Sequence, residues 1–314
     1  MSEKKVIAVV GATGSQGGGL VRAILADPNG GFAARAITHN PDSEKAKALA
    51  AAGAEVVQAD VEDTDSLRRA FDGAYGAYCV TFYWSHLSPE KELQHAHNMA
   101  RAAHDAELRH VVWSTLEDTR NWIPLSDDRM PTLMEHYKVP HFDAKGESDA
   151  AFRELGVPTT YLLTSFYWDN FIHFGMGPAR GADGKLAITF PLGESKMPSI
   201  AAEDIGRCAY GLFKRPELIG KRVGIAGEHV TGAEMAAGFS KEFGEEVRYN
   251  AVDPATYRGF GFPGADDLGN MFQFYRDFEG DFRKPRDVEF SRELNPQLQD
   301  FSTWVAANKS AIKI

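Results

Sequence analysis

The chain has 314 residues, of which 43% are hydrophobic and 25% charged, a composition that allows one large α/β domain or such a domain with a smaller lobe. The formal net charge of −10 disfavours nucleic acid as a partner, because an acidic surface repels phosphates and no Lys/Arg run offsets it. The apolar runs are too short for a membrane span or a signal peptide, and the two cysteines lie among apolar neighbours, so we expect a cytoplasmic protein with buried free thiols.

Short β-branched runs alternate with helical segments over the first half of the chain. We expect strands at 4–10, 33–38, 54–60, 77–82 and 109–115, with helices at 18–27, 43–53, 64–73 and 88–106 between them. Thr64 is expected to cap the third of these helices, and Ser88 followed by Pro89 is expected to begin the fourth. Alternation of strand and helix at this length predicts a parallel, doubly wound sheet.

The second half is less regular. We expect a helix at 144–156, a strand at 159–164, a helix at 203–214, a strand at 221–227 and a helix at 231–243, followed by a tail rich in Phe, Tyr and Gly. The fold class predicted is therefore α/β, with a Rossmann-type nucleotide-binding domain over residues 1–160. Residues 161–314 are expected to form a smaller α/β lobe that binds a substrate or a partner and is interwoven with the first domain.

The sequence GATGSQGGG begins with the pattern G-x-x-G-x-x-G at Gly11, Gly14 and Gly17, between an expected strand and an expected helix. Small residues let the backbone approach a pyrophosphate, and free N–H groups at the helix start meet its negative charge. This spacing is the variant found in short-chain dehydrogenases, and it predicts a dinucleotide site. The alternative is a plain tight turn.

The end of the second expected strand indicates which dinucleotide binds. An NAD site usually places a carboxylate there for the ribose 2′-hydroxyl, whereas this chain has Thr38, His39 and Asn40. We therefore expect NADP(H), with NAD(H) left open because no arginine is present to bind a 2′-phosphate. Asp60, at the end of the third strand, is expected beside the adenine; the alternative is that it only faces water.

A classical short-chain dehydrogenase carries Tyr-x-x-x-Lys after the fifth strand. The literal match, Tyr210 with Lys214, lies almost a hundred residues past Ser114, and we interpret it as a surface helix end. At the expected place stand His141 and Lys145, whose i, i+4 spacing brings an acid and a positive charge to one helical face. The alternative is that Lys145 only binds a ribose and that His141 lies in a loop.

Other candidate sites are weaker. The histidines at 95, 97, 104 and 110 form no i, i+4 pair and have no carboxylate cluster beside them, so no metal site is predicted. Ser114 and Thr115 could bind a substrate carbonyl or simply end the fifth strand. The aromatic runs at 83–84 and 166–168 and the Phe-rich tail indicate either a ring-binding pocket or part of the core.

Five segments together resemble the NmrA-like family, a branch of the atypical short-chain dehydrogenases, and are most similar to its redox-sensing members. They are GATGSQGGGLVRAIL at 11–25, VTFYW at 80–84, HFDAKGE at 141–147, YWDN at 167–170 and GFPGADDLGNMFQFY at 261–275. The resemblance runs nearly end to end, and the last two segments are far more specific than the glycine loop.

The resemblance implies a Rossmann domain that binds NADP(H) and a smaller C-terminal lobe bearing a cleft. It implies that four residues of the glycine loop contact the pyrophosphate and ribose, and that four others lie near the nicotinamide. The first four are Thr13, Gly14, Gln16 and Gly17, and the others are Thr81, Lys145, Tyr167 and Asn170. The expected cofactor site also includes Gly11, Ser15, Thr38, His39, Asp60, Val61 and Phe82.

Two positions depart from the family pattern. His39 stands where the family often has arginine, which weakens selectivity for NADP. Phe82 stands where the family has an asparagine, so a ring replaces an amide near the cofactor.

Two functions follow from the resemblance and the residues. The first is a redox sensor or regulator that responds to the NADPH/NADP level through a protein partner, with a homodimer allowed by the resemblance. The second is an NADPH-dependent reductase of a carbonyl, quinone or aromatic substrate that uses Lys145 and also His141. The missing Tyr-x-x-x-Lys favours the first.

Overall fold

The computed structural model describes residues 4–314 and is built on a seven-stranded, wholly parallel sheet in the order β11-β6-β5-β4-β1-β2-β3. Its strands are β1 (Lys5–Val9), β2 (Phe32–Thr38), β3 (Glu55–Gln58), β4 (Gly76–Cys79), β5 (His110–Thr115), β6 (Thr159–Leu163) and β11 (Arg222–Gly224). The strand order reverses between β1 and β4, and ligands of open α/β sheets bind at the carboxyl ends of strands at such a point. The predicted doubly wound parallel sheet is confirmed.

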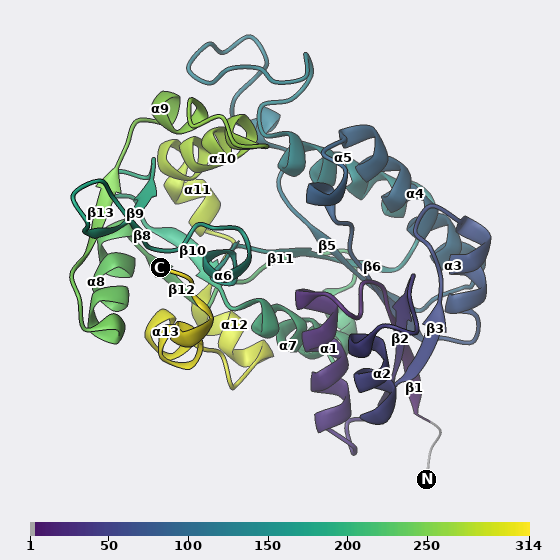
Figure 1. Ribbon diagram of the computed structural model, residues 1–314. Coiled ribbons are helices and arrows are strands. Elements are labelled where there is room, and N and C mark those ends of the chain that lie inside the picture. Colours follow the sequence, from purple (N-terminus) through teal and green to yellow (C-terminus); the bar gives the residue numbers. More distant parts are fainter. Residues whose placement is uncertain (1–3) are drawn as a thin grey trace.

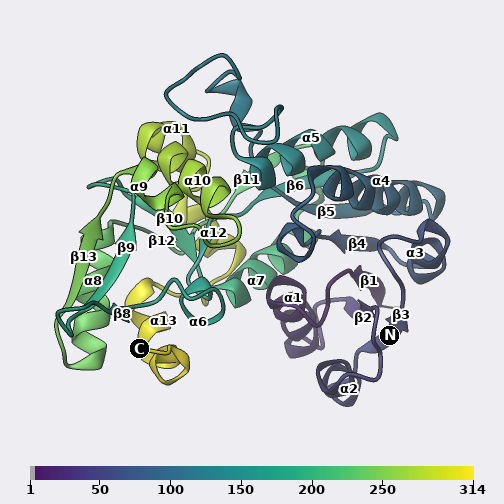
Figure 2. The ribbon, with the colours of Figure 1, turned by 45° about the horizontal axis from the view of Figure 1, so that its top comes forward.

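Helices cover both faces of this sheet (Figures 1 and 2). One face carries α3 (Thr64–Phe71), α4 (Pro89–Asp105) and α5 (Pro140–Glu154), and the other carries α1 (Ser15–Ala26), α2 (Glu44–Ala51) and α7 (Ala202–Phe213). Glycines let α1 and α7 cross closely, because a Cβ on Gly206 would lie 2.1 Å from the backbone nitrogen of Leu20. Since α7 and β11 come from the second half of the chain, the two halves are interwoven.

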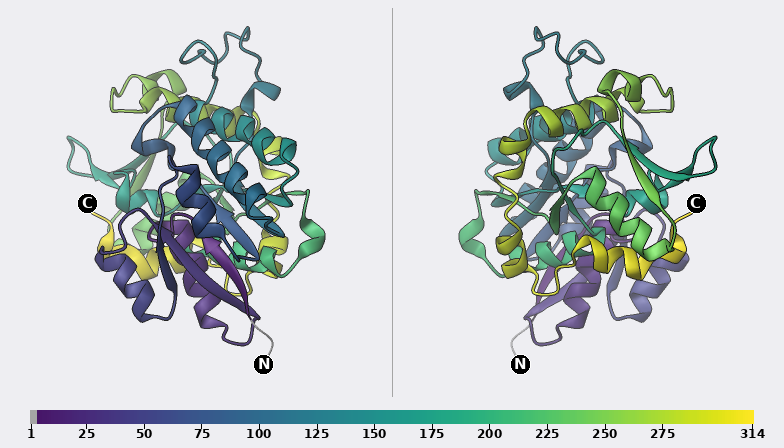
Figure 3. Two further views of the ribbon diagram at one scale, coloured as in Figure 1. Left: turned by 90° about the vertical axis from the view of Figure 1, so that its right-hand side faces the viewer. Right: turned by 90° about the vertical axis from the view of Figure 1, so that its left-hand side faces the viewer.

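The smaller lobe holds two three-stranded sheets, in the orders β12-β10-β7 and β13-β9-β8. Its strands are β7 (Phe166–Tyr167), β8 (Ala179–Arg180), β9 (Leu186–Phe190), β10 (Met197–Ile200), β12 (Glu228–Val230) and β13 (Val247–Ala251). Its helices are α6 (Asn170–His173), α8 (Gly232–Phe243), α9 (Pro254–Arg258), α10 (Ala265–Asp277), α11 (Glu279–Arg283) and α13 (Phe301–Asn308), whereas α12 (Val288–Leu294) packs against α7 beside the large sheet. Short 3-10 turns are η1 (Tyr83–Ser85), η2 (Thr119–Asn121), η3 (Pro216–Leu218) and η4 (Lys309–Ala311). Figure 3 shows the N-terminal elements in front in one view and the green and yellow lobe in front in the other.

Three apolar clusters form the core. Two of them lie on the two faces of the large sheet, and the third fills the smaller lobe with aromatic rings. Tyr83, Phe166 and Trp168 are at most 3% exposed, so much of the two aromatic runs belongs to the core. Cys79 and Cys208 are buried free thiols, as predicted. No helix within residues 4–314 is long and apolar enough to cross a membrane.

Two of the observed helix boundaries differ from the predicted ones because a cap or a proline was misread. Asp63, not Thr64, caps α3 by accepting from the backbone N–H groups of Asp65 and Ser66. Helix α5 begins at Pro140 rather than at 144, because proline is favoured in the first helical turn. His141 is therefore helical and not a loop residue.

Candidate functional site

The glycine loop leaves the end of β1 as a tight turn into α1. Gly11 has φ +65°, in the left-handed region that favours glycine. A Cβ on Gly17 would lie 2.5 Å from the carbonyl oxygen of Gly11, so the first turn of α1 packs directly on the loop. The loop thus requires glycine at these positions for steric reasons.

Free amides gather at the start of α1. Gly14 donates to the carbonyl of Gly11 at 2.9 Å, and Gly18 donates to that of Gly14 at 2.9 Å. Between them, the N–H groups of Ser15, Gln16 and Gly17 have no hydrogen-bond partner within the described chain. Unpaired N–H groups and the positive end of a helix favour an anion. These residues fit the pyrophosphate of a dinucleotide.

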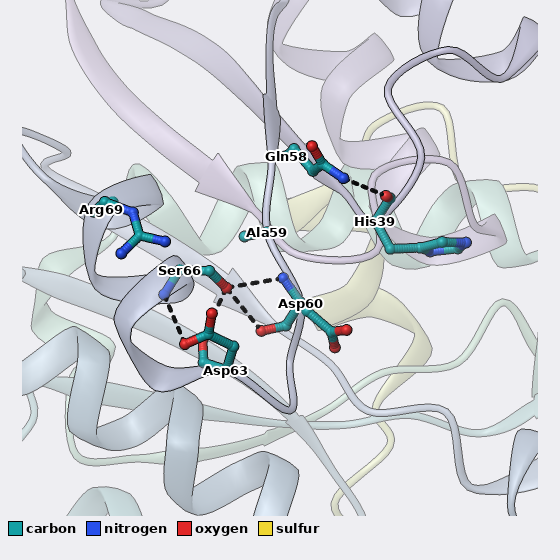
Figure 4. Close-up of a pocket in the computed structure, with 7 residues that line it drawn as sticks. All are labelled: His39, Gln58, Ala59, Asp60, Asp63, Ser66 and Arg69. Carbon is teal, nitrogen blue, oxygen red and sulfur yellow. Dashed lines mark hydrogen bonds between the residues drawn. The ribbon is translucent and has the colours of Figure 1, made fainter.

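A second part of the expected cofactor site lies beside the ends of β2 and β3. His39 and Asp60 both line an open cavity of about 280 Å³, together with Gln58, Ala59, Asp63, Ser66 and Arg69. Figure 4 shows the side-chain amide of Gln58 donating to the backbone carbonyl of His39. It also shows the Ser66 hydroxyl hydrogen-bonded to the backbone N–H and carbonyl of Asp60. Arg69 is exposed and contributes a cation that the sequence interpretation did not include. Thr38 is buried and accepts from the backbone N–H of Asn40.

The side chain of Gln16 points into the protein rather than away from it. Its Nε2 donates to the Tyr167 hydroxyl at 2.6 Å, and its Oε1 accepts from Tyr78 and from Ser114, the latter at 2.9 Å. Burial raises the pKa of Tyr167 to about 12 and raises that of Tyr78 as well, so both phenols stay protonated at neutral pH. The network links the glycine loop to Tyr167 in β7 of the smaller lobe.

Lys145 projects from α5 to the end of β4. Its ammonium donates to the hydroxyl of Thr81 and lies 2.8 Å from Oε1 of Glu92, a fully buried carboxylate of α4. Thr81 also donates to that carboxylate, and the Lys145 side chain is only 12% exposed. Thr81 and Lys145, both expected near the nicotinamide, thus contact each other, and Glu92 joins them.

His141 lies one turn before Lys145 on α5. Its Nδ1 is 2.6 Å from Oδ1 of Asp267, and its backbone N–H donates to Oδ2 of the same carboxylate. Asp267 lies in the first turn of α10, so a helix of the smaller lobe fixes the ring. The Trp84 ring lies 4.8 Å from the imidazole, measured between centroids. His141 and Lys145 are thus each held by a buried carboxylate from another helix.

The remaining expected residues are scattered around these groups. Phe82 follows β4 and is 60% exposed, so its ring is not packed into the core. The carbonyl of Val61 accepts from Asn98 of α4, and Asn170 begins α6. Tyr210 and Lys214 both bind Asp27, which lies just past the end of α1 that is distant from the glycine loop.

Sequence reasoning missed Glu92, Asp267 and Tyr78. Glu92 could have been found from helical spacing, because residues 92, 96, 99 and 103 form one stripe of α4 and Glu92 is its only charged member. Asp267 lies within the distinctive segment at 261–275, but nothing local indicates that its carboxylate reaches α5. Tyr78 is indistinguishable by pattern from its apolar neighbours in β4.

Comparison with known sequences gives one family over almost the whole chain. The profile of the NmrA-like family matches residues 3–305. The NmrA-like family domain-containing oxidoreductase FrzB of Cladobotryum sp is 30% identical over 308 residues, covering 90% of this chain and 88% of that protein.

Solved structures share the fold. NmrA, a negative transcriptional regulator, in complex with NADP superimposes with a TM-score of 0.78 at 23% identity, over 97% of this chain and 95% of that one. The Citrobacter sp. triphenylmethane reductase complexed with NADP(H) gives a TM-score of 0.75 at 22% identity, over 97% and 99%. At these identities the likeness establishes the fold.

Proposed function

The chain belongs to the NmrA-like family, and on that premise we propose that it is an NADP(H)-dependent reductase. Two names in the comparisons support the proposal: FrzB is called an oxidoreductase, and the triphenylmethane reductase was crystallised with NADP(H). The absence of a carboxylate after β2, where Thr38 and His39 stand, supports NADP(H) over NAD(H). Arg69 and His39 are the nearby groups for a 2′-phosphate.

One observation carries the proposal: a lysine and a histidine on successive turns of α5 are each paired with a buried carboxylate. Lys145 with Glu92, and His141 with Asp267, are fixed by contacts of 2.8 Å and 2.6 Å. Both pairs are largely buried, where hydrogen bonds and charge interactions are stronger than in water. Proton donors held in advance near the end of β4 are what a reductase needs to protonate a reduced substrate.

Each part of the candidate site has its own role in the proposed reaction. The glycine loop binds the pyrophosphate through the free amides of α1, while Thr81 and Lys145 border the nicotinamide end. Bound NADPH supplies a hydride to a carbonyl, quinone or other conjugated acceptor. Lys145 donates a proton to the oxygen that gains negative charge, and Glu92 holds the ammonium in place. His141, which Asp267 orients, lies one turn before Lys145 on α5 and is the second candidate proton donor.

NADPH oxidation by the purified protein tests this function. We expect turnover with at least one member of a carbonyl and quinone panel, followed by absorbance at 340 nm. Lys145→Ala should lower kcat by about 10²–10⁴, because it removes a positioned general acid. Lys145→Arg keeps the positive charge, but a guanidinium gives up a proton far less easily than an ammonium does, so this variant should also be slow.

The matched control is Lys241→Ala, which removes an exposed lysine of α8 and should leave kcat unchanged. Full activity in Lys145→Ala, with NADPH still bound, would remove Lys145 from the mechanism.

A second function, that of a redox sensor acting through a protein partner, is favoured by the Gln16 network. Gln16 of the glycine loop is hydrogen-bonded directly to Tyr167 of the smaller lobe, so a structural change in the loop would also affect that lobe. Tight binding of NADPH without turnover across the whole panel would favour the sensor over the reductase.

A further inference from the structure

Phe82 stands where the strand order of the large sheet reverses. It follows β4, the strand that lies next to β1 across the reversal, and ligands of open α/β sheets bind at this edge. Its ring is 60% exposed, more than any other large hydrophobic side chain within residues 4–314. A single exposed ring is ordinary on a protein surface. This one lies at the edge of the sheet where the cofactor and an acceptor must meet.

The two residues before Phe82 connect the glycine loop with the proposed proton donor. A Cβ on Gly11 would lie 3.3 Å from Cγ1 of Val80, so Val80 borders the glycine loop. The hydroxyl of Thr81 accepts from the ammonium of Lys145 on the other side of the segment. Side chains alternate along extended backbone, and Phe82 has a φ of −127° and a ψ of 79°, which puts its ring on the side of Val80. The ring thus borders the space between the glycine loop and Lys145.

A second ring of the same segment lies beside the other candidate donor. Trp84 is half-buried, and its ring centroid is 4.8 Å from that of the His141 imidazole. Gly264 packs on this ring, because a Cβ there would lie 2.9 Å from Cζ3 of Trp84. Tyr83, between the two rings, is only 2% exposed and belongs to the core. The aromatic segment is therefore divided between the core and the candidate site.

We propose that Phe82 is a specificity-determining residue whose ring stacks on the acceptor and selects flat aromatic carbonyl compounds. The inference rests on the proposed reductase function and names the substrate class of the same site. An aromatic acceptor gains a ring–ring interaction in addition to the burial of apolar area, whereas a saturated ring of the same size gains the burial alone. The asparagine that the family pattern has at this position carries no ring, so this selectivity would distinguish the chain from that pattern.

The reaction itself balances as for any carbonyl acceptor. The hydride of NADPH forms a C–H bond at the carbonyl carbon, the π electrons move to the oxygen, and an N–H bond of Lys145 breaks as an O–H bond forms. Lys145 regains its proton from solvent. One NADPH, one proton and one ketone become NADP⁺ and one secondary alcohol.

The test compares the Kd values of acetophenone and cyclohexyl methyl ketone, which differ only in whether the six-membered ring is aromatic. Both are titrated by calorimetry into protein loaded with NADP⁺, which has no hydride to give. The wild type should bind acetophenone more tightly. Phe82→Leu keeps an apolar side chain without a ring and should lower this preference by about threefold to tenfold. Phe82→Tyr keeps a ring and should retain the preference.

Kinetics provide a second measurement. In Phe82→Leu the KM for acetophenone should rise, while kcat and the Kd for NADPH stay within about twofold of the wild-type values. Phe290→Leu is the matched control. The Phe290 ring packs on the guanidinium of Arg215, which follows Lys214 and the distant end of α1, far from the glycine loop. This variant should show the wild-type preference.

Each outcome decides the proposal. A wild type without a preference for acetophenone, or a preference that persists in Phe82→Leu, would overturn the role of Phe82. A higher Kd for NADPH in Phe82→Leu with an unchanged ketone preference would place the ring on the nicotinamide and also overturn it. The Kd values require no turnover. A ring preference lost in Phe82→Leu, in a protein that reduces neither ketone, would therefore keep the aromatic subsite and remove the reductase. Reduction of both ketones without a ring preference would keep the reductase and remove the subsite.

Discussion

At the scale of single residues, Gly17 is the tightest point of the glycine loop. Its Cα approaches the carbonyl of Gly11 so closely that a Cβ would lie 2.5 Å from that oxygen, against backbone that cannot rotate away. Gly17→Ala should therefore displace the first turn of α1 and its free amides. We expect the Kd for NADPH to rise about tenfold or more, which corresponds to about 1.4 kcal/mol of binding free energy.

Calorimetric titration with NADPH measures this effect. Gly280→Ala is the matched control, since Gly280 is also helical and a Cβ there meets nothing within 4 Å. That variant should bind NADPH like the wild type. Unchanged affinity in a folded Gly17→Ala protein would contradict the assignment of the loop to the pyrophosphate.

Some residues of the candidate site could be predicted from the sequence, and others could not. The glycine loop and Lys145 are recognisable in the sequence because chain-local spacing determines their chemistry, whereas Thr81 was indicated only by the family resemblance. The partners that hold the proton donors are not: Glu92 is 53 residues from Lys145, and Asp267 is 126 residues from His141. Such contacts arise only when α4, α5 and α10 pack together.

At the scale of elements, Asp149 joins α5 to the large sheet. Its Oδ1 accepts from the indole N–H of Trp113 at 2.9 Å and from the Thr115 hydroxyl at 2.7 Å, and its Oδ2 lies 3.2 Å from Arg222. Burial raises the pKa of this carboxyl to about 6, although Arg222 and the two donors lower it. The folded protein thus binds this proton more tightly than the unfolded chain, whose pKa is near the ordinary value of 3.8.

The sign of the pH dependence follows from this. The stabilisation from protonated Asp149 is fully present below about pH 4 and is lost as the pH rises through about 6. Asp149→Asn has no carboxyl to ionise and therefore keeps its stability as the pH rises. Between pH 4 and 7 the free energy of unfolding of this variant, relative to that of the wild type, should increase by about 2–3 kcal/mol. Urea denaturation across this range measures the difference.

Asp128→Asn, at an exposed position, is the control and should track the wild type. If the free energies of unfolding of Asp149→Asn and the wild type changed with pH in the same way, the proposed titration of Asp149 would be contradicted.

Element prediction succeeded where a single element carries its own signal. β1 to β6 and α1 to α5 follow periodicity, caps and glycine stops, and their positions came out within a few residues. β7 and β8 have two residues each, too few for any periodicity, and their pairing depends on neighbours that come later in the chain. The helices after Pro254 are short or carry aromatic residues on several sides, because they pack into a core that surrounds them.

At the scale of the whole molecule, one buried arginine ties the smaller lobe to the large sheet. Arg286, 0% exposed, binds both carboxylate oxygens of Glu117, at 2.6 and 2.9 Å, beyond the end of β5. It also donates to the carbonyl of Thr164 after β6, and its guanidinium stacks on the ring of Phe282 in α11 at 3.7 Å. Because three distant segments meet at one side chain, no local pattern could have predicted it.

Removing the buried Arg286–Glu117 ion pair should lower the free energy of unfolding more than removing any exposed ion pair would. Arg286→Met leaves the Glu117 carboxylate buried without its cation, and we expect a loss of about 3–5 kcal/mol in the free energy of unfolding, measured by urea denaturation. The double variant with Glu117→Leu removes the stranded charge and should recover part of that loss, although the carbonyl of Thr164 still lacks its donor. Arg248→Met, which breaks an exposed pair with Asp183, should cost no more than about 1 kcal/mol. A single variant no less stable than Arg248→Met, or a double variant less stable than the single, would show that the buried charge does not hold the lobe to the sheet.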